Sequence, residues 1–343
     1  MRPSFLARLV NGPLFDPVVF IRLLNRNTSL LFDCGRIGNL SNREILSIDS
    51  IFISHPHMDH FMGFDHVLRI ILHRERPLNL YGPDGIADKV ISKLNSYTWN
   101  LTRDYPLEVM IHEVRDHDIL SRSARAGNAF KPSMPASSPR RGATIATNPF
   151  YSVDASVLDH HMPCLGFVLK EPFHININAA RIAELGYTTG PWIGELKRLI
   201  LAECMDDYID VPAITGNRRI KVHELFMELV ITSAGQKIGY FTDIRASGDN
   251  LKRIRELAGN MDILFIEAYY LAEREQQAHE KAHLTAREAG LIAGMVRARK
   301  VVPMHISPRY HDRIDEVMGE LTAARISYGD ISRNVLISRP FFR

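Results

Sequence analysis

The sequence contains little cysteine and no long apolar run. Its 343 residues include three cysteines, an odd number that forms no disulfide framework. The apolar stretches have the length of single β-strands, far below the roughly 20 residues that a membrane-spanning helix needs. The first eight residues lack the continuous apolar segment of a secretory signal. We therefore expect a cytoplasmic protein in a reducing environment, with no membrane anchor.

The sequence also has little excess of either charge. Forty-two Lys and Arg residues against 39 Asp and Glu give a formal net charge of +3. So small a balance is compatible with a polyanionic partner but does not by itself predict one. The hydrophobic content of 45% is ordinary for a globular protein and provides for a sizeable core. No repeat of fixed period is present. A chain of this length can form one large domain or two small ones, and we expect a single domain over residues 1–343.

One short segment is rich in metal-binding side chains. His55, His57, Asp59 and His60 fall within six residues, directly after the apolar run of residues 49–53. That run is typical of a buried strand, so the cluster follows the point where a strand leaves its sheet. Imidazole and carboxylate groups are ligands that zinc and similar divalent ions accept. The segment therefore predicts a metal site, because a solvated loop has no reason to carry four such side chains here.

Further residues of the same kinds follow other short apolar segments, namely His160, Asp243, Glu267 and His305. In layered α/β proteins, functional side chains gather at the carboxyl ends of strands. We therefore expect these residues to join the histidine cluster in one site. His161, the residue after His160, is the alternative to His160 as a ligand.

The ligand chemistry predicts two metal ions. Two dications about 3.5–4 Å apart need a carboxylate between them to offset their repulsion, and Asp243 is the natural bridge. The remaining ligands divide into two sets. We assign His55, His57 and His160 to one ion, and Asp59, His60 and His305 to the other.

Three other segments carry predictions about organisation. Residues 115–148 are basic and rich in Ser, Pro, Ala and Gly, which predicts a long mobile insertion that either contacts phosphates or is simply solvated. Residues 170–221 contain two helical patterns and predict a helical arm leaving a sheet core. Residues 222–233 and 236–241 predict a pair of strands. His112, near the basic insertion, is predicted to be a surface residue.

The pattern His55-x-His57-x-Asp59-His60 is the signature of the metallo-β-lactamase superfamily. More narrowly, the sequence resembles the ribonuclease Z branch, the tRNA 3′-processing endonucleases, from about residue 30 to residue 310. The features typical of that branch are Gly190-Pro191, the Glu267 and His283 pair, and the ending His305-Ile306-Ser307. The matching segments are residues 31–35, 55–60, 159–167, 184–197, 242–243, 266–268, 282–285 and 305–310.

The resemblance implies an α/β fold, the four-layer αββα sandwich, with the helical arm as an exosite-like excursion. It implies a phosphodiester hydrolase that uses two divalent metal ions, Zn²⁺ first and Mn²⁺ or Fe²⁺ as alternatives. In such a site His283 protonates the departing ribose oxygen, Glu267 orients His283, and Asp59 both binds metal and positions the attacking water. The implied substrate is precursor tRNA, and the implied assembly is a homodimer.

The resemblance does not extend to the N-terminal region. Residues 10–17 lack the Gly-Thr turn and the basic loop that the family has near its cleavage site, and Arg36-Ile37-Gly38 stands where the family has Glu-Gly-Thr. The chemistry is therefore better defined than the substrate. One alternative is a small phosphodiester of the cyclic-nucleotide type at the same site. Another, of a different class, is a non-catalytic RNA-binding metalloprotein.

Overall fold

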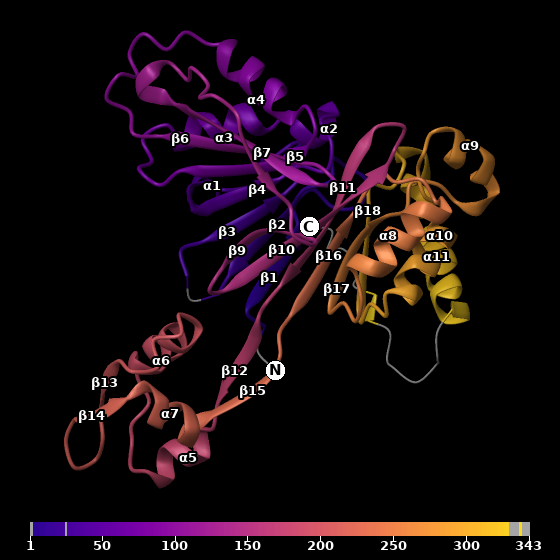
Figure 1. The fold of residues 1–343 in the computed structure, drawn as a ribbon. Coiled ribbons are helices and arrows are strands. Elements are labelled where there is room, and N and C mark those ends of the chain that lie inside the picture. Colours follow the sequence, from indigo (N-terminus) through magenta and orange to yellow (C-terminus); the bar gives the residue numbers. More distant parts are fainter. Residues whose placement is uncertain (1–2, 25, 329–335, 338–343) are drawn as a thin grey trace. The chain divides into compact units, whose positions relative to one another are not determined.

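The computed structural model describes residues 3–24, 26–328 and 336–337. The chain, expected as one domain with an arm over residues 170–221, groups into two compact units. The smaller unit is built mainly from residues 170–236, and the larger unit contains most of the remaining chain. Every predicted site residue belongs to the larger unit, which carries both main sheets (Figure 1).

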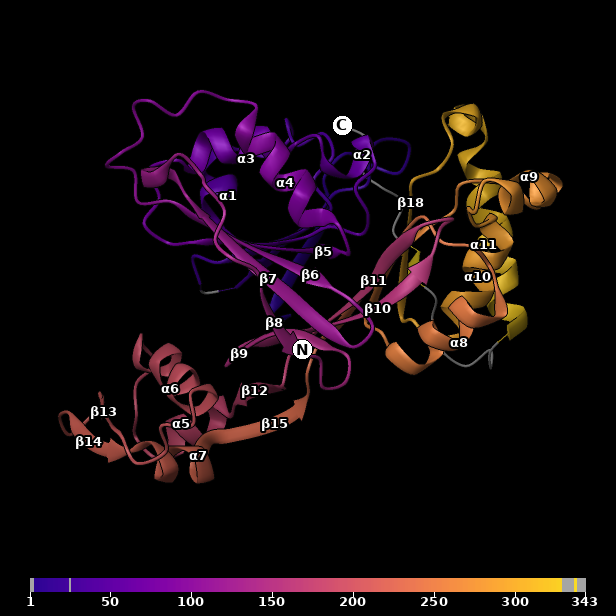
Figure 2. The ribbon, with the colours of Figure 1, turned by 45° about the horizontal axis from the view of Figure 1, so that its top comes forward.

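An eight-stranded sheet forms one half of the larger unit, with its strands in sequence order. The four central strands are parallel and the outer ones antiparallel. Three helices cover one face of this sheet (Figure 2), where Ile45, Val67 and Val90 join its apolar core. The elements are β1 (Phe5–Leu9), β2 (Val19–Leu23), β3 (Ser29–Phe32), β4 (Ile48–Phe52), β5 (Leu78–Pro83), β6 (Glu108–Val114), β7 (Asp118–Arg125), β8 (Ala136–Pro139), α1 (Asn42–Ser47), α3 (Phe64–Ile71) and α4 (Ile86–Asn95).

A seven-stranded sheet forms the other half, in the order β19-β18-β17-β16-β11-β10-β9. Its helices pack on one face (Figure 1), with Ile254, Ile292 and Leu321 in the core beneath them. The elements are β9 (Thr144–Asn148), β10 (Tyr151–Asp159), β11 (Pro163–Lys170), β16 (Lys237–Phe241), β17 (Ile263–Glu267), β18 (Lys300–Met304), β19 (Leu336–Ile337), α8 (Gly248–Leu257), α10 (Ala286–Met295) and α11 (Ile314–Tyr328).

Aromatic side chains fill the space between the two sheets. A row of rings crosses β3, β4, β5 and β6, with successive centroids 4.9, 5.0 and 4.5 Å apart; it consists of Phe32, Phe52, Tyr81 and His112. Phe167 of β11 meets the rings of Phe32 and Phe52 edge-on at 5.7 Å. Because strand side chains alternate between faces, each sheet buries one face against its partner and the other against helices. The predicted four-layer αββα sandwich is confirmed.

Two of the predictions about local structure are wrong. Residues 115–148, expected to be an irregular insertion, contain strands β7, β8 and β9. These strands are held by backbone pairing at the sheet margin and need few apolar side chains; all four residues of β8 are exposed. Residues 222–229, expected to be a strand, form helix α7 (Val222–Leu229). Its apolar Val222, Leu225 and Leu229 lie three and four positions apart and are buried on one helical face.

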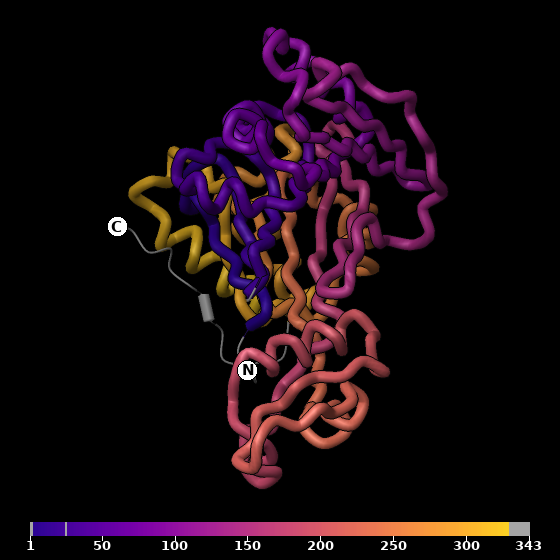
Figure 3. Tube along the Cα trace, turned by 90° about the vertical axis from the view of Figure 1, so that its left-hand side faces the viewer, coloured from indigo at the N-terminus to yellow at the C-terminus, as the bar shows by residue number. Residues whose placement is uncertain are grey.

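The smaller unit has its own apolar core, in which Trp192, Leu196 and Leu225 are buried. Figure 3 shows the pink-to-orange trace of these residues folding back on itself. Two antiparallel strand pairs accompany the three helices. The prediction of a helical arm is therefore incomplete, because the unit also contains strands. The elements are β12 (Phe173–Ile177), α5 (Ala179–Glu184), α6 (Trp192–Leu201), β13 (Tyr208–Val211), β14 (Arg218–Lys221), α7 and β15 (Val230–Ala234). Across both units, no described helix has the length and apolarity needed to cross a bilayer.

His112 contributes a pH-dependent term to stability. It is not the surface residue that was predicted: its Nδ1 lies 2.8 Å from Ser121 Oγ, and its buried Nε2 has no partner among the described residues. Burial lowers the pKa of His112 from 6.5 to about 4. At pH values between about 4 and 6.5, the His112 imidazole is protonated in the unfolded chain more readily than in the folded chain. The stability contributed by neutral His112 is therefore present above the unfolded pKa and is lost as the pH falls through this window.

We expect His112→Gln, which does not titrate, to remove this dependence. On going from about pH 7 to about pH 4.5, the wild-type chain should lose about 2 kcal/mol more stability than the variant does. Urea unfolding of both proteins at the two pH values measures the difference, in which contributions from all other groups cancel. Equal losses in the two proteins would contradict the assignment.

Candidate metal centre

A buried carboxylate, Asp33, holds the histidine loop in place. Its Oδ1 accepts a hydrogen bond from the Ser54 amide at 2.6 Å, and its Oδ2 accepts from the Ser54 hydroxyl at 2.7 Å and the Tyr240 hydroxyl at 2.6 Å. Oδ2 also lies 2.7 Å from Nδ1 of His60, and both side chains are fully buried. Because Nδ1 donates to Asp33, the opposite nitrogen of His60 is free to act as a metal ligand.

The turn after Asp33 packs backbone to backbone against the histidine loop. The Cys34 amide donates to the His60 carbonyl at 2.7 Å, and a Cβ added at Gly35 would lie 1.9 Å from the carbonyl oxygen of Asp59. Only glycine fits at this position, because the obstructing atom is backbone and cannot rotate away.

We expect Gly35→Ala to displace the loop and to destabilise the protein by about 1–3 kcal/mol or more. Gly38→Ala is the matched control, because a Cβ there would meet nothing within 4 Å and Gly38 is exposed. Thermal unfolding and bound metal per chain should both fall for the first variant and stay near wild type for the second. If both variants matched the wild type, the close approach would have no structural role.

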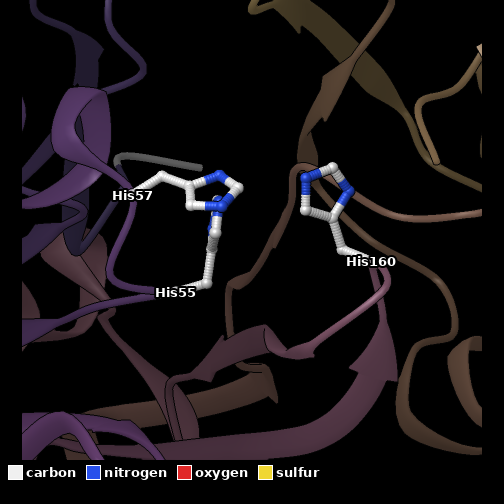
Figure 4. Close-up of side chains that lie close together, drawn as sticks. All are labelled: His55, His57 and His160. Atoms are coloured by element: carbon white, nitrogen blue, oxygen red, sulfur yellow. The ribbon is translucent and has the colours of Figure 1, made fainter. Parts of the chain in front are cut away.

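Three histidines from two segments converge on one point. His55 and His57 follow β4, and His160 follows β10; Figure 4 shows the three imidazoles gathered together. Their ligand atoms all lie within 4.8 Å of one another. The centroids of the His55 and His57 rings are 4.3 Å apart, and that of His160 lies 5.1 Å from His55. This is the set that the sequence assigned to one ion.

The second predicted set is also gathered. The ligand atoms of Asp59, His60 and His305 lie within 4.8 Å of one another. Asp243 faces both sets: its Oδ2 is 3.0 Å from His60 Nε2 and 3.2 Å from His305 Nδ1, and its Oδ1 is 3.7 Å from His160 Nε2. One carboxylate oxygen is therefore directed to each set, as a bridging carboxylate requires.

The distances between the donor atoms are those expected of ligands around a metal ion, and the atoms are not paired with one another by hydrogen bonds. His55 Nε2, His60 Nε2 and His305 Nδ1 are buried without a hydrogen-bond partner among the described residues, which is costly unless another group satisfies them. Neighbouring donors of a tetrahedral zinc ion lie about 3.3 Å apart, given bonds of about 2.0–2.1 Å. The separations of 3.0 to 3.4 Å from His60 Nε2 to Asp243 and Asp59 match that spacing without forming hydrogen bonds. The residues present therefore fit divalent metal ions.

His160, rather than His161, faces the site. Nδ1 of His160 donates to the Ala282 carbonyl at 2.8 Å, which leaves Nε2 directed toward Asp243. Both ring nitrogens of the exposed His161 are engaged elsewhere: Nδ1 lies 2.7 Å from the Arg245 guanidinium, and Nε2 lies 3.1 Å from the Glu280 carbonyl. His161 thus has no nitrogen available for a metal.

Burial and neighbouring charges set the protonation of the ligands. Burial, together with the adjacent histidines, lowers the pKa of His55 to about 2, so its imidazole is neutral at physiological pH. Burial opposes protonation of His60 and His305 as well, but Asp243 overrides it and raises the pKa of both. In turn, and against its own burial, His305 and His60 hold the pKa of Asp243 well below its usual range. A dication at the same point would compete with protons for these ring nitrogens.

Three site residues adopt left-handed backbone conformations at strand ends. Asp33, Asp243 and His305 have φ values of 54°, 50° and 51°. Such conformations cost about 1–3 kcal/mol for residues other than glycine and persist where the surroundings define them. Here they turn the chain sharply at the point where each strand delivers its side chain to the site.

A buried Glu267 holds His283 beside the ligands. Glu267 Oε2 lies 3.0 Å from His283 Nδ1, and Oε1 accepts from the Ile244 amide at 2.8 Å and the Leu284 amide at 3.3 Å. Although burial opposes it, Glu267 raises the pKa of His283. Nε2 of His283 has no hydrogen-bond partner within the described part of the chain, and His283 lines a cavity of about 390 Å³ next to the ligands.

The same cavity is lined by residues that the sequence analysis did not identify, among them Tyr269, Tyr270 and Lys281. Tyr269 and Tyr270 directly follow the strand that carries Glu267, and this proximity was the only available signal. Asp33 lies in a segment that matched the family but carried no predicted role. Its function depends on contacts with β16 that no local pattern reveals.

Comparison with known proteins identifies the family. Residues 208–306 match the model of the beta-lactamase superfamily domain. The ribonuclease Z of Deinococcus radiodurans is 33% identical over 289 residues, which cover 83% of this chain and 84% of the relative. This chain belongs to the ribonuclease Z family. The ribonuclease Z of Pyrococcus horikoshii is 28% identical over 82% of this chain and 78% of its own length.

Solved structures agree on the fold of this ribonuclease Z family member. The crystal structure of the short form of human tRNase Z superposes with a TM-score of 0.50 at 18% identity, covering 89% of this chain and 93% of that one. The predicted family is thus confirmed, and with it the assignment as a metal-dependent hydrolase that binds divalent metal.

Proposed function

We propose that this chain is an endoribonuclease that uses two zinc ions to process the 3′ ends of precursor tRNA. The observation that carries the proposal is the pairing of two ligand sets across Asp243, with the Glu267 and His283 pair at their edge. Two sets of donors about a common carboxylate are the arrangement that phosphodiester-cleaving two-metal sites use. The supporting relatives carry the name ribonuclease Z.

Each ligand has a defined task in this proposal. His55, His57 and His160 would hold one ion, Asp59, His60 and His305 would hold the other, and Asp243, which faces both sets, would serve both ions. The bound metals supply Lewis acidity, which favours ionisation of a water molecule near neutral pH and neutralises charge on the phosphate. The Asp59 side chain is 41% exposed, so it can accept a hydrogen bond from the attacking water and align it in line with the scissile bond.

His283 is the general acid of the proposal. A ribose 3′ oxygen leaves poorly unless it is protonated as the bond to phosphorus breaks. Glu267 and Asp243 raise the pKa of His283 against the effect of burial, which favours the protonated form that a general acid needs. Glu267 fixes Nδ1, so the proton delivered is the one on Nε2. The products carry a 3′ hydroxyl on the tRNA and a 5′ phosphate on the trailer.

The substrate is the second part of the proposal. The human structure that shares the fold is a tRNase Z, and precursor tRNA is the substrate that name implies. A small phosphodiester at the same cavity is the alternative that the experiment must separate. The homodimer and the cytoplasmic location remain expectations. Sedimentation of the purified chain tests the first, and fractionation of the source cells tests the second.

Cleavage of a defined precursor tests the function. The zinc-loaded chain is incubated with a precursor tRNA that carries a 3′ trailer, with the mature tRNA as the control RNA, and the cut site and end groups are mapped. We expect one endonucleolytic cut beside the acceptor stem, a 3′ hydroxyl on the tRNA, and a rate that falls steeply as salt rises, because the substrate is a polyanion. Turnover of small diesters without cleavage of the precursor would favour the alternative and contradict the proposal.

A further inference from the structure

The ring of Tyr269 lies flat against the imidazole of His283. The two ring centroids are 4.1 Å apart, and the ring planes differ by 9°. The edge of the same tyrosine meets His305 at 5.1 Å with an interplanar angle of 68°. Tyr269 is half-buried and lines the cavity that the metal-ligand groups also line. The turn that presents Glu267 therefore also presents an aromatic surface to its partner His283.

One hydrogen bond alone does not orient an imidazole. Glu267 Oε2 lies 3.0 Å and Asp243 Oδ1 3.3 Å from the same nitrogen, Nδ1 of His283, so both carboxylates act at one edge of the ring and neither packs against its face. The other neighbouring rings are steeply inclined to it: His160 lies 5.1 Å away at 59°, His305 5.7 Å away at 67°, and Tyr270 6.2 Å away at 63°. Among the described residues, only the ring of Tyr269 lies parallel to that of His283, and stacking of this kind favours one orientation of the ring.

We propose that Tyr269 is a positioning residue that sets the plane of His283 so that its Nε2 proton is directed at the leaving oxygen. This inference rests on the proposed role of His283 as general acid. Proton transfer requires the donor within hydrogen-bond reach and along the correct line, and a small misplacement costs much of the rate. The backbone of Tyr269 is itself fixed, since its carbonyl accepts from the Ser307 amide at 3.1 Å.

The stacked ring, rather than the phenol hydroxyl, is the part of Tyr269 that acts. Tyr269→Phe keeps the flat surface and should retain activity. Tyr269→Leu and Tyr269→Met keep an apolar side chain but remove the planar face. Two such variants are made so that one can still be assayed if the other does not fold. None of these changes removes the backbone contact to Ser307. Each variant is first checked for wild-type thermal unfolding and metal content, since Tyr269 also touches the ligand His305.

The experiment compares two substrates with different needs for a proton. Precursor tRNA needs its leaving oxygen protonated, whereas bis(p-nitrophenyl) phosphate releases a nitrophenolate that leaves without a proton. For Tyr269→Leu or Tyr269→Met we expect the cleavage rate constant on precursor tRNA to fall about 10–100-fold, with KM within about twofold of wild type. Hydrolysis of the nitrophenyl diester should be unchanged, and Tyr269→Phe should match wild type on both substrates.

Three results would overturn the inference: unchanged RNA cleavage by the leucine and methionine variants, equal losses on both substrates, or a phenylalanine variant as impaired as leucine. His283→Ala is run in parallel to separate this inference from the function on which it rests. If His283→Ala loses only RNA cleavage and Tyr269→Leu does not, the positioning role alone is wrong. If His283→Ala is itself not selective, the proposed general acid is wrong.

Discussion

Asp243→Ala is expected to abolish cleavage and to release metal from the chain. Asp243 is almost fully buried, and its two carboxylate oxygens face His60 and His305 on one side and His160 on the other. Without this carboxylate, two neighbouring dications would repel with no bridging charge to offset it. We expect a fall in activity of about a thousandfold or more and fewer than two metal ions per chain.

The measurement pairs metal analysis of the purified variants with cleavage of precursor tRNA. Asp243→Asn keeps the shape of the side chain without its charge and should fail in the same way. Asp249→Ala removes an exposed aspartate from α8 and is the matched control, expected to behave as wild type. A fully metal-loaded and active Asp243→Ala chain would show that the carboxylate does not bridge.

His283→Ala is expected to lower RNA cleavage by about 10²–10⁴-fold, the usual contribution of a positioned general acid. The metal ligands remain, so metal content should equal that of the wild type. Hydrolysis of bis(p-nitrophenyl) phosphate should stay within about threefold, because its leaving group needs no proton. The loss therefore depends on the leaving group, which separates proton donation from any general damage to the site.

His279→Ala is the control for this variant. His279 lies four residues earlier, on α9 (Glu275–Glu280), and is exposed, with Nε2 2.7 Å from Glu288. It should retain both activities. Equal losses of His283→Ala on both substrates would assign His283 a structural or metal-binding role and remove the general acid from the mechanism.

The gathering of the proposed ligands could be predicted in outline because these residues are concentrated in recognisable local patterns. Four of them fall within six residues after β4, and the others directly follow strands whose apolar runs are easy to recognise. Parallel strands bring their carboxyl ends to one edge, so the residues after them converge. The pairing of Glu267 with His283 came from the family resemblance, and the structure brings the two to 3.0 Å.

The errors have equally local causes. The strand predicted across residues 222–233 forms only at Val230–Ala234, where β-branched residues are concentrated, whereas the spacing of Val222, Leu225 and Leu229 is helical. Marginal strands such as β8 carry no apolar alternation, because their faces are solvated and backbone pairing alone holds them. The supporting roles of Asp33 and Tyr269 depend on contacts between distant segments. Single-sequence patterns contain no information about such contacts.

The central claim is that seven side chains from four segments of the chain, with Asp243 between the two sets, enclose two divalent ions. Titration of the metal-depleted full-length chain with Zn²⁺, followed by metal analysis and cleavage of precursor tRNA at each step, tests it most directly. The account predicts that binding saturates at two ions per chain and that cleavage returns only as the second ion binds. Saturation at a single ion, or full cleavage by the exhaustively chelated chain, would contradict it.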